Sequence, residues 1–148
     1  MKWPEYFKNI AHQVSLKSKD DHTQIGAVIV GPENEIVSTG YNSFPRGIND
    51  NVSERQARPE KYFWFEHAER NAIYNAARIG VSTKGCTIYL TSDMPCADCA
   101  RGIINSGIVK VVITLNGAAN SAKWKRSAKR SAMMFSEAKV IVDHFKDI

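Results

Sequence analysis

Three residues that can bind zinc stand in two short segments, and they constrain the fold more than any other feature of the chain. His67 lies two residues before Glu69, and Cys96 lies three residues before Cys99. Imidazole nitrogen and thiolate sulfur are common zinc ligands, and a structural site is normally closed by four of them. Three ligands leave one coordination position open. The sequence therefore predicts a fold that brings the two segments together around a zinc ion that water can reach.

The sequence around both segments is typical of the first turn of a helix. Pro95 suits the entry to a helix, and Cys96 and Cys99 are spaced to share one helical face. Thiolates at a helix N-terminus are stabilised by the macrodipole, which lowers their pKa. The stretch 68–77 carries an apolar stripe at helical spacing and predicts a second helix that begins beside His67.

Glu69 supplies a carboxylate that the metal does not need as a ligand. The pattern H-x-E followed by P-C-x-x-C is typical of zinc-dependent nucleobase deaminases. One neutral imidazole and two thiolates cancel most of the zinc charge, so water at the metal is acidified less than in an all-histidine site. A general base is then required. The pattern predicts a hydrolytic deaminase in which His67, Cys96 and Cys99 bind zinc and Glu69 is catalytic.

The bulk properties favour one domain over residues 1–148. A chain of this length can bury a core, and its 43% hydrophobic and 24% charged residues are ordinary for a globular protein. Cys86 is the one cysteine outside the zinc pattern, which excludes a disulfide framework and predicts that Cys86 packs as a small apolar residue. We expect a reducing, cytoplasmic location and no membrane contact, because the sequence shows no signal peptide or membrane-length apolar run.

Hydrophobic periodicity predicts alternating strands and helices. We expect helices over 4–17, 68–77, 96–106 and 124–138, and strands over 25–30, 36–41, 86–91, 108–115 and 140–142. This alternation implies a largely parallel sheet, to which the opening hairpin adds an antiparallel edge. Residues 42–61 are expected to form a long polar loop, and loops of that length are often functional. His12, His22 and His144 are expected to be ordinary exposed histidines.

Several motifs narrow the family further. They are Ser18-Lys19-Asp20, residues 24–30, Gly40-Tyr41-Asn42-Ser43-Phe44-Pro45-Arg46-Gly47 and Arg58-Pro59-Glu60-Lys61-Tyr62. Together with the two zinc segments, they resemble the deoxycytidylate (dCMP) deaminase family of the cytidine deaminase superfamily, over residues 17–112. The zinc pattern alone indicates the superfamily, and the loop after Gly40 narrows it to this branch.

The resemblance implies a three-layer α/β/α sandwich around a five-stranded mixed sheet. It implies a zinc cofactor and the hydrolysis of dCMP to dUMP and ammonia, which supplies thymidylate synthesis. His67, Cys96 and Cys99 match the family's zinc ligands, Glu69 its proton shuttle, and Asn42 the asparagine that approaches the substrate sugar. Asn42 follows a predicted strand, so a simple Asx-turn explains it too. The resemblance also implies a homo-oligomer and deoxynucleoside triphosphate effectors, although the sequence locates no effector site.

Basic residues are candidates for the 5′-phosphate of such a substrate, because arginine binds phosphate in a bidentate manner. Arg46 is our first candidate, and Arg55 and Arg58 lie in the same loop. The formal net charge is +5, and near the C-terminus it is concentrated in Lys123, Lys125, Arg126, Lys129 and Arg130. Both a solvated helix face and a phosphate-facing or nucleic-acid-facing patch explain this basic run.

Two other functions remain open at this point. One is a zinc deaminase that edits tRNA or single-stranded nucleic acid, which the basic run favours and the Phe44-Pro45-Arg46-Gly47 loop opposes. The other is a non-catalytic module that zinc merely stabilises, against which the intact Glu69 argues. We expect a nucleotide substrate and no nucleic-acid partner. Binding to a polymer would weaken steeply with salt, which separates the first alternative.

Overall fold

Alternate residues of one strand, β1 (Gly26–Val30), face two different cores, and the fold is built around this strand. The computed structural model describes residues 1–114 and 121–148. The other strands are β2 (Ile36–Tyr41), β3 (Thr87–Leu90), β4 (Lys110–Ile113) and β5 (Ile141–His144). The helices are α1 (Trp3–Ser15), α2 (Ser53–Gln56), α3 (Lys61–Trp64), α4 (Ala68–Ile79), α5 (Ala97–Asn105) and α6 (Ala122–Glu137), followed by the 3₁₀ turn η1 (Phe145–Asp147).

The five strands form one mixed sheet in the order β2-β1-β3-β4-β5, as the resemblance implied. β3 is parallel to β4, and β4 is parallel to β5, but β1 is antiparallel to both of its neighbours. The hairpin of β1 and β2 therefore forms an antiparallel edge of the sheet, as predicted, with β2 as the edge strand and β1 one strand further in. The helix α4 carries the chain from β2 to β3, past β1. Strands β2 and β3 run in the same direction on either side of β1, and a connection between parallel strands needs a long crossover such as this helix.

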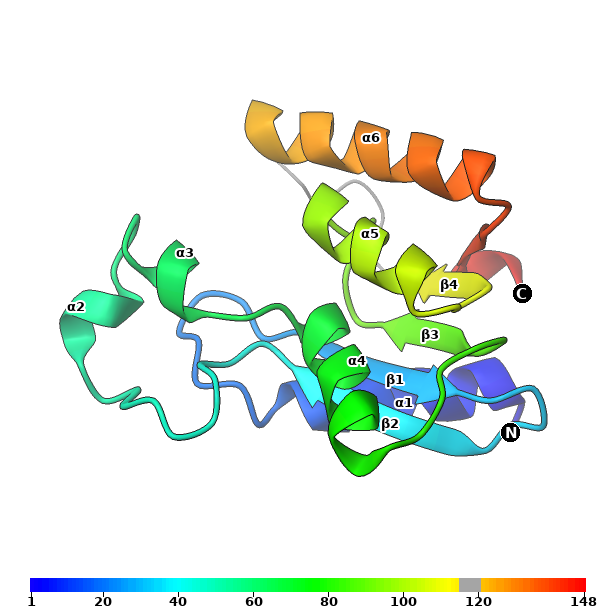
Figure 1. The fold of residues 1–148 in the computed structure, drawn as a ribbon, viewed down its shortest axis with the longest axis horizontal. Coiled ribbons are helices and arrows are strands. Elements are labelled where there is room, and N and C mark those ends of the chain that lie inside the picture. Colours follow the sequence, from blue (N-terminus) through cyan, green and yellow to red (C-terminus); the bar gives the residue numbers. More distant parts are fainter. Residues whose placement is uncertain (115–120) are drawn as a thin grey trace.

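Helices cover both faces of this sheet, which confirms the predicted α/β/α sandwich (Figure 1). On one face, Phe7 and Ala11 of α1 pack against Val28, Val30, Tyr89 and Val112. On the other face, buried residues of α4 and α5 meet the alternate residues of β1, β3 and β4, and Cys86 is buried in this core as predicted. The helix α6 lies over α5 and adds the buried Phe135.

Gly40 allows α4 to approach the sheet closely. A Cβ atom at this position would lie 2.3 Å from the backbone nitrogen of Ala72 and 2.6 Å from the carbonyl oxygen of Ala68, both in α4. Any larger residue at Gly40 would push the helix away from β2. Because His67 is the N-cap of α4 and Glu69 lies in its first turn, this close packing fixes the height of the predicted site above the sheet.

Local departures from the predicted elements are small. The long loop contains α2 and α3, each of four residues, which are too short to show a periodicity. The predicted strand 108–115 is realised as β4, and its last residue, Leu115, lies outside the described residues. His12 and His22 are exposed as expected, but His144 in β5 is half-buried, because it lies in a strand that packs beside β4. Within the described residues, no helix is both long and apolar enough to cross a membrane.

Candidate active site and metal centre

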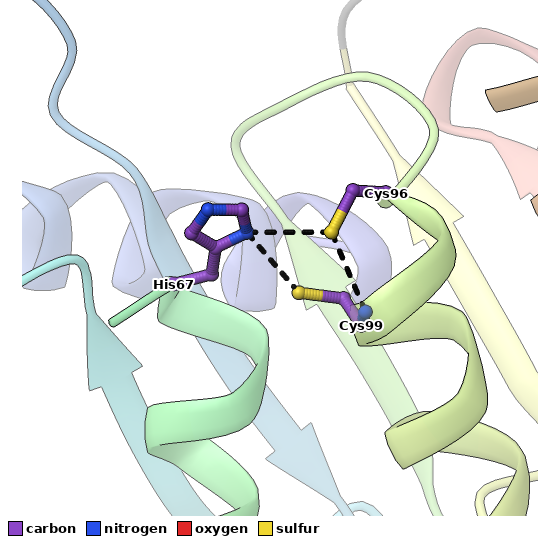
Figure 2. A group of neighbouring side chains, drawn as sticks. All are labelled: His67, Cys96 and Cys99. Atoms are coloured by element: carbon purple, nitrogen blue, oxygen red, sulfur yellow. Dashed lines mark hydrogen bonds between the residues drawn. The ribbon is translucent and has the colours of Figure 1, made fainter. Parts of the chain in front are cut away.

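The three predicted zinc ligands meet between the first turns of α4 and α5 (Figure 2). The Nδ1 atom of His67 lies 3.5 Å from the Sγ atom of Cys96 and 3.3 Å from that of Cys99. Around a tetrahedral zinc with ordinary bond lengths, a nitrogen and a sulfur ligand are about 3.6 Å apart. The spacing of these atoms and their chemical type therefore fit zinc. In the described part of the chain, no other cluster of His, Cys, Asp and Glu residues could hold a metal.

Both helix starts are built to present these ligands. Cys96 is the N-cap of α5, and its sulfur accepts a hydrogen bond from the backbone N–H of Cys99, over 3.4 Å. His67 is the N-cap of α4. The residue before it, Glu66, forms a two-bond backbone bridge with Ser43, of 2.7 and 3.1 Å. The carboxylate of Glu66 also accepts the His67 N–H, so that the backbone holding the imidazole is fixed from two sides.

The sulfur pair has the electrostatics of a cation site. Contact with the Cys99 thiol, together with hydrogen bonding to His67, outweighs burial and lowers the pKa of Cys96 to about 4. The same contact and burial raise the pKa of Cys99, because two adjacent thiolates repel each other. The pair therefore holds one negative charge readily. A zinc ion would compensate the second charge and displace the remaining proton.

Glu69 lies in the first turn of α4 and is 4% exposed. Burial is the largest influence on its carboxyl group and raises its pKa above the usual value, although the positive charge of His67 acts in the opposite direction. A carboxyl group with a raised pKa holds a proton more readily than an ordinary one, which suits a group that accepts a proton and later returns it. Glu69 thus has the environment of a general acid–base, beside the three metal ligands.

A cavity of about 370 Å³ opens onto this site. Its wall includes His67, Glu69 and Asn42, together with aromatic side chains and a small number of charged ones. The remaining lining residues are Asp20, Thr23, Ile25, Arg58, Lys61, Tyr62, Phe65, Ala68, Ser92, Asp93, Ser121 and Trp124. The accessible surface of this wall is mostly apolar although many of its residues are polar, and such a pocket with convergent polar groups suits a small organic ligand.

Asn42 is 7% exposed and forms part of the cavity wall. Its Oδ1 atom accepts a hydrogen bond from the N–H of Ile25 over 2.8 Å, and its Nδ2 atom donates to the carbonyl oxygen of Thr23 over 2.7 Å. These bonds reach across to another segment, so they are not an Asx-turn. A second Nδ2 bond, to Asp20, is 3.5 Å long and therefore weak. The amide keeps one acceptor lone pair and one weakly held N–H available to a ligand.

The structure separates the candidate phosphate-binding residues. Arg46 and Arg58 are both exposed, but Arg58 lines the zinc-site cavity, whereas Arg46 lines a second cavity of about 520 Å³. Phe65 is the one residue that the two linings share, and the larger cavity touches none of the three zinc ligands. Arg55 instead stacks on the ring of Trp64 at 4.0 Å. Lys123 and Lys125 are exposed on α6, on either side of the cavity residue Trp124.

Sequence reasoning missed Asp20 and Lys61, which pair with each other in the cavity wall. Both residues stand in motifs that resemble the dCMP deaminase family, and this resemblance was the one sign in the sequence that they belong to the site. Nothing in the local pattern indicated that the two side chains meet, since they are 41 positions apart. A charged residue in a polar segment is ordinarily expected to be solvated.

Comparison with known proteins places these observations in a family. The model of the cytidine and deoxycytidylate deaminase zinc-binding region matches residues 1–115, which include His67, Cys96 and Cys99. A deoxycytidylate deaminase of Homo sapiens is 41% identical over 117 residues, which cover 76% of this chain and 64% of that protein. An uncharacterized deaminase of Aliivibrio fischeri is 40% identical over 141 residues, which cover 95% and 92% of the two chains.

Solved structures agree with the fold. The dCMP deaminase of cyanophage S-TIM5, solved in complex with dCMP and dUMP, superposes with a TM-score of 0.77. The match covers 97% of this chain and 98% of that one, at 23% identity. The chain spans about two thirds of the length of the human relative.

Proposed function

Because the chain belongs to the cytidine and deoxycytidylate deaminase family, with its zinc-binding region, we propose that it converts dCMP and water to dUMP and ammonia. The observation that carries this proposal is the buried carboxyl group of Glu69 beside three metal ligands that leave a fourth position open. A structural zinc site has no use for either feature. The human relative at 41% identity is a deoxycytidylate deaminase, which supports this substrate over other cytosine compounds.

Glu69 is the group that moves protons in this proposal. Zinc held by His67, Cys96 and Cys99 would supply an open position that lowers the pKa of a water molecule, so that the water can lose a proton and attack C4 of the cytosine ring. Glu69 takes the proton released by the attacking water and delivers it to N3. It then passes the second proton to the exocyclic amine, which leaves as ammonia while the C4 carbonyl forms. The raised pKa of Glu69 suits a carboxyl group that alternates between base and acid within one turnover.

Asn42 is proposed to recognise the sugar. The deoxyribose of dCMP has a single hydroxyl group, at the 3′ position, because the 2′ oxygen is absent and the 5′ oxygen carries phosphate. The free lone pair on Oδ1 and the weakly held Nδ2 proton allow the amide to bond that hydroxyl group as acceptor or donor. The family resemblance assigns the same role to this position.

We propose Arg58 as the phosphate ligand in place of our first candidate, Arg46, because Arg58 lines the zinc-site cavity and Arg46 lines the other one. We expect Arg58→Gln to raise the KM for dCMP about tenfold or more, because a charge-assisted hydrogen bond to phosphate is lost. The KM for deoxycytidine, which has no phosphate, should stay unchanged. Steady-state kinetics on the two substrates measure this difference.

Arg46→Gln and Arg55→Gln are the matched controls for this prediction. Each removes the same charge from the same loop, but Arg46 lines the other cavity and Arg55 is held against Trp64. Neither should change the ratio of the two KM values by more than about twofold, in line with the small effects of surface substitutions. If Arg46→Gln changed the ratio of the two KM values more than Arg58→Gln did, Arg46 would be the phosphate ligand instead.

The editing alternative has one structural observation in its favour. Lys123, Lys125, Arg126, Lys129 and Arg130 are all exposed on α6, whose first turn borders the cavity. A substrate panel of dCMP, dCTP, cytidine and a cytosine-containing oligonucleotide separates this alternative from the proposal by ammonia release. We expect dCMP to be the best substrate, with kcat/KM that changes little between 50 and 200 mM salt, whereas a polymer substrate should lose affinity by orders of magnitude. Preference for the oligonucleotide would overturn the proposal.

Some expectations extend the same proposal. We expect one deaminase domain over residues 1–148, a homo-oligomer, and a cytoplasmic location. We also expect deoxynucleoside triphosphates to act as effectors. If the zinc-loaded protein deaminated none of the substrates in the panel, a non-catalytic module stabilised by zinc would describe the protein better. That result would also contradict the catalytic role given to Glu69.

A further inference from the structure

A buried ion pair lies in the cavity wall, and the deamination chemistry makes no use of it. The Nζ atom of Lys61 lies 2.9 Å from Oδ2 and 3.1 Å from Oδ1 of Asp20. The two side chains are only 8% and 6% exposed. Replacing such a pair with uncharged residues is often neutral or stabilising, because taking both charges out of water costs about as much as their attraction gains. Stability alone therefore does not explain why two charges are kept here.

Asp20 connects Lys61 to the residue proposed to hold the sugar. Its Oδ1 atom accepts the backbone N–H groups of His22 and Thr23, over 2.9 and 3.3 Å. Its Oδ2 atom receives the weak 3.5 Å bond from Nδ2 of Asn42. The carbonyl oxygen of Thr23 accepts the stronger bond from Asn42 Nδ2. Asp20 is therefore one acceptor for this amide nitrogen, and it holds the residue that provides the other.

Lys61 links the segment just before His67 to this network. It is the first residue of α3, and its backbone carbonyl oxygen accepts the N–H of Phe65, two residues before His67. Its ammonium group also lies 5.4 Å from the centre of the Phe65 ring. Burial raises the pKa of Asp20, but the hydrogen bond from Lys61 and those from the backbone outweigh it, and the net pKa is lowered. The carboxylate is thus held ionised at neutral pH.

We propose that Asp20 and Lys61 are positioning residues that orient the Asn42 amide for the 3′-hydroxyl group of the substrate. This inference rests on the proposed function and deepens it. The ionised carboxylate holds one Nδ2 proton of Asn42 in line, and Lys61 holds the carboxylate. Because the Asn42–Asp20 bond is long, a substrate hydroxyl group replaces it at little cost. Without the pair, the second Nδ2 proton loses its acceptor and the Thr23 carbonyl oxygen is anchored less firmly, so the Asn42 amide is no longer held in one orientation.

The double variant Asp20→Asn/Lys61→Met separates positioning from stability. Asparagine keeps the shape of aspartate and an oxygen for the N–H groups of His22 and Thr23, but it is uncharged and turns an N–H donor toward Asn42. Methionine fills much of the lysine volume without a charge. Lys61→Met alone leaves a buried carboxylate unpaired and should lower the melting temperature, whereas the double variant should recover most of it. The readout is the preference for dCMP over 2′,3′-dideoxy-CMP, which lacks only the hydroxyl group, measured as the ratio of the two kcat/KM values.

We expect wild-type protein to prefer dCMP about threefold to tenfold or more, the effect of one hydrogen bond, and the double variant to lose that preference although it is folded and zinc-loaded. As a control, Lys110→Met/Asp143→Asn removes another ion pair, of 3.0 Å between β4 and β5, and should leave the preference intact. A stable double variant that still prefers dCMP would overturn the positioning role and leave the proposed function standing. Wild-type protein that does not deaminate dCMP would overturn the proposed function itself, and the inference with it.

Discussion

Replacing Glu69 with glutamine is expected to abolish turnover of dCMP while zinc and dCMP still bind. Glutamine has nearly the shape of glutamate, so the buried packing at the start of α4 should survive. It accepts no proton from the attacking water and carries none to N3. A general acid–base group contributes about 10²- to 10⁴-fold, and Glu69 serves several transfers, so the loss should reach or exceed the upper end. Single-turnover deamination, with zinc content and dCMP affinity from the same preparation, measures it.

Glu69→Asp is the graded companion of this variant. It keeps a carboxylate but withdraws it by one methylene, so activity should fall between those of wild type and Glu69→Gln. Activity of Glu69→Gln within about tenfold of wild type, which corresponds to about 1.4 kcal/mol of barrier, would exclude Glu69 as the proton shuttle. Loss of zinc along with activity would instead assign the residue to the metal site.

Cys99→Ala is expected to remove zinc and to destabilise the fold. Metal analysis of the wild-type protein should find about one zinc per chain, since the described residues contain one ligand set. A metal that binds only the folded state stabilises it, by about 4 kcal/mol when free zinc exceeds its Kd 1,000-fold. Cys99 is fully buried, so alanine also removes core contacts. Metal analysis and denaturant unfolding, each with and without added zinc, measure the two effects.

Cys86→Ala is the matched control, because it removes the same atoms from another buried cysteine that lies outside the metal site. This variant should lose some stability from packing but keep its zinc and the stabilisation that zinc provides. Full zinc occupancy in Cys99→Ala would show that the ligand assignment is wrong. Equal loss of zinc in both variants would show that occupancy merely follows the overall stability of the fold.

The metal site was predictable because its residues carry a local signal. The spacing of Cys96 and Cys99, with proline before them, indicates a helix start, and the histidine with the glutamate indicates another. The structure confirms that both segments begin helices and that the three ligand atoms converge. One detail differs: Cys96 is the N-cap of α5 and lies just outside the helix, so its sulfur can accept the Cys99 N–H.

The parts of the fold and of the site that the sequence did not predict depend on contacts between segments that are far apart in the chain. Strand β1 pairs with β3 although β2, the long loop and α4 stand between them in the sequence, and no local pattern shows that β1 lies inside the sheet. The predicted phosphate ligand, Arg46, and the alternative, Arg58, stand in the same loop, and only its path shows which one borders the zinc-site cavity. The pairing of Asp20 with Lys61 likewise follows from the path of the chain between them.

Zinc-dependent hydrolysis of dCMP is tested by incubating the zinc-loaded protein with dCMP and quantifying nucleotide and ammonia together. We expect dUMP and ammonia in a one-to-one ratio, loss of both after zinc is chelated, and their return when zinc is restored. Unchanged dCMP after prolonged incubation with fully zinc-loaded, folded protein would contradict the account.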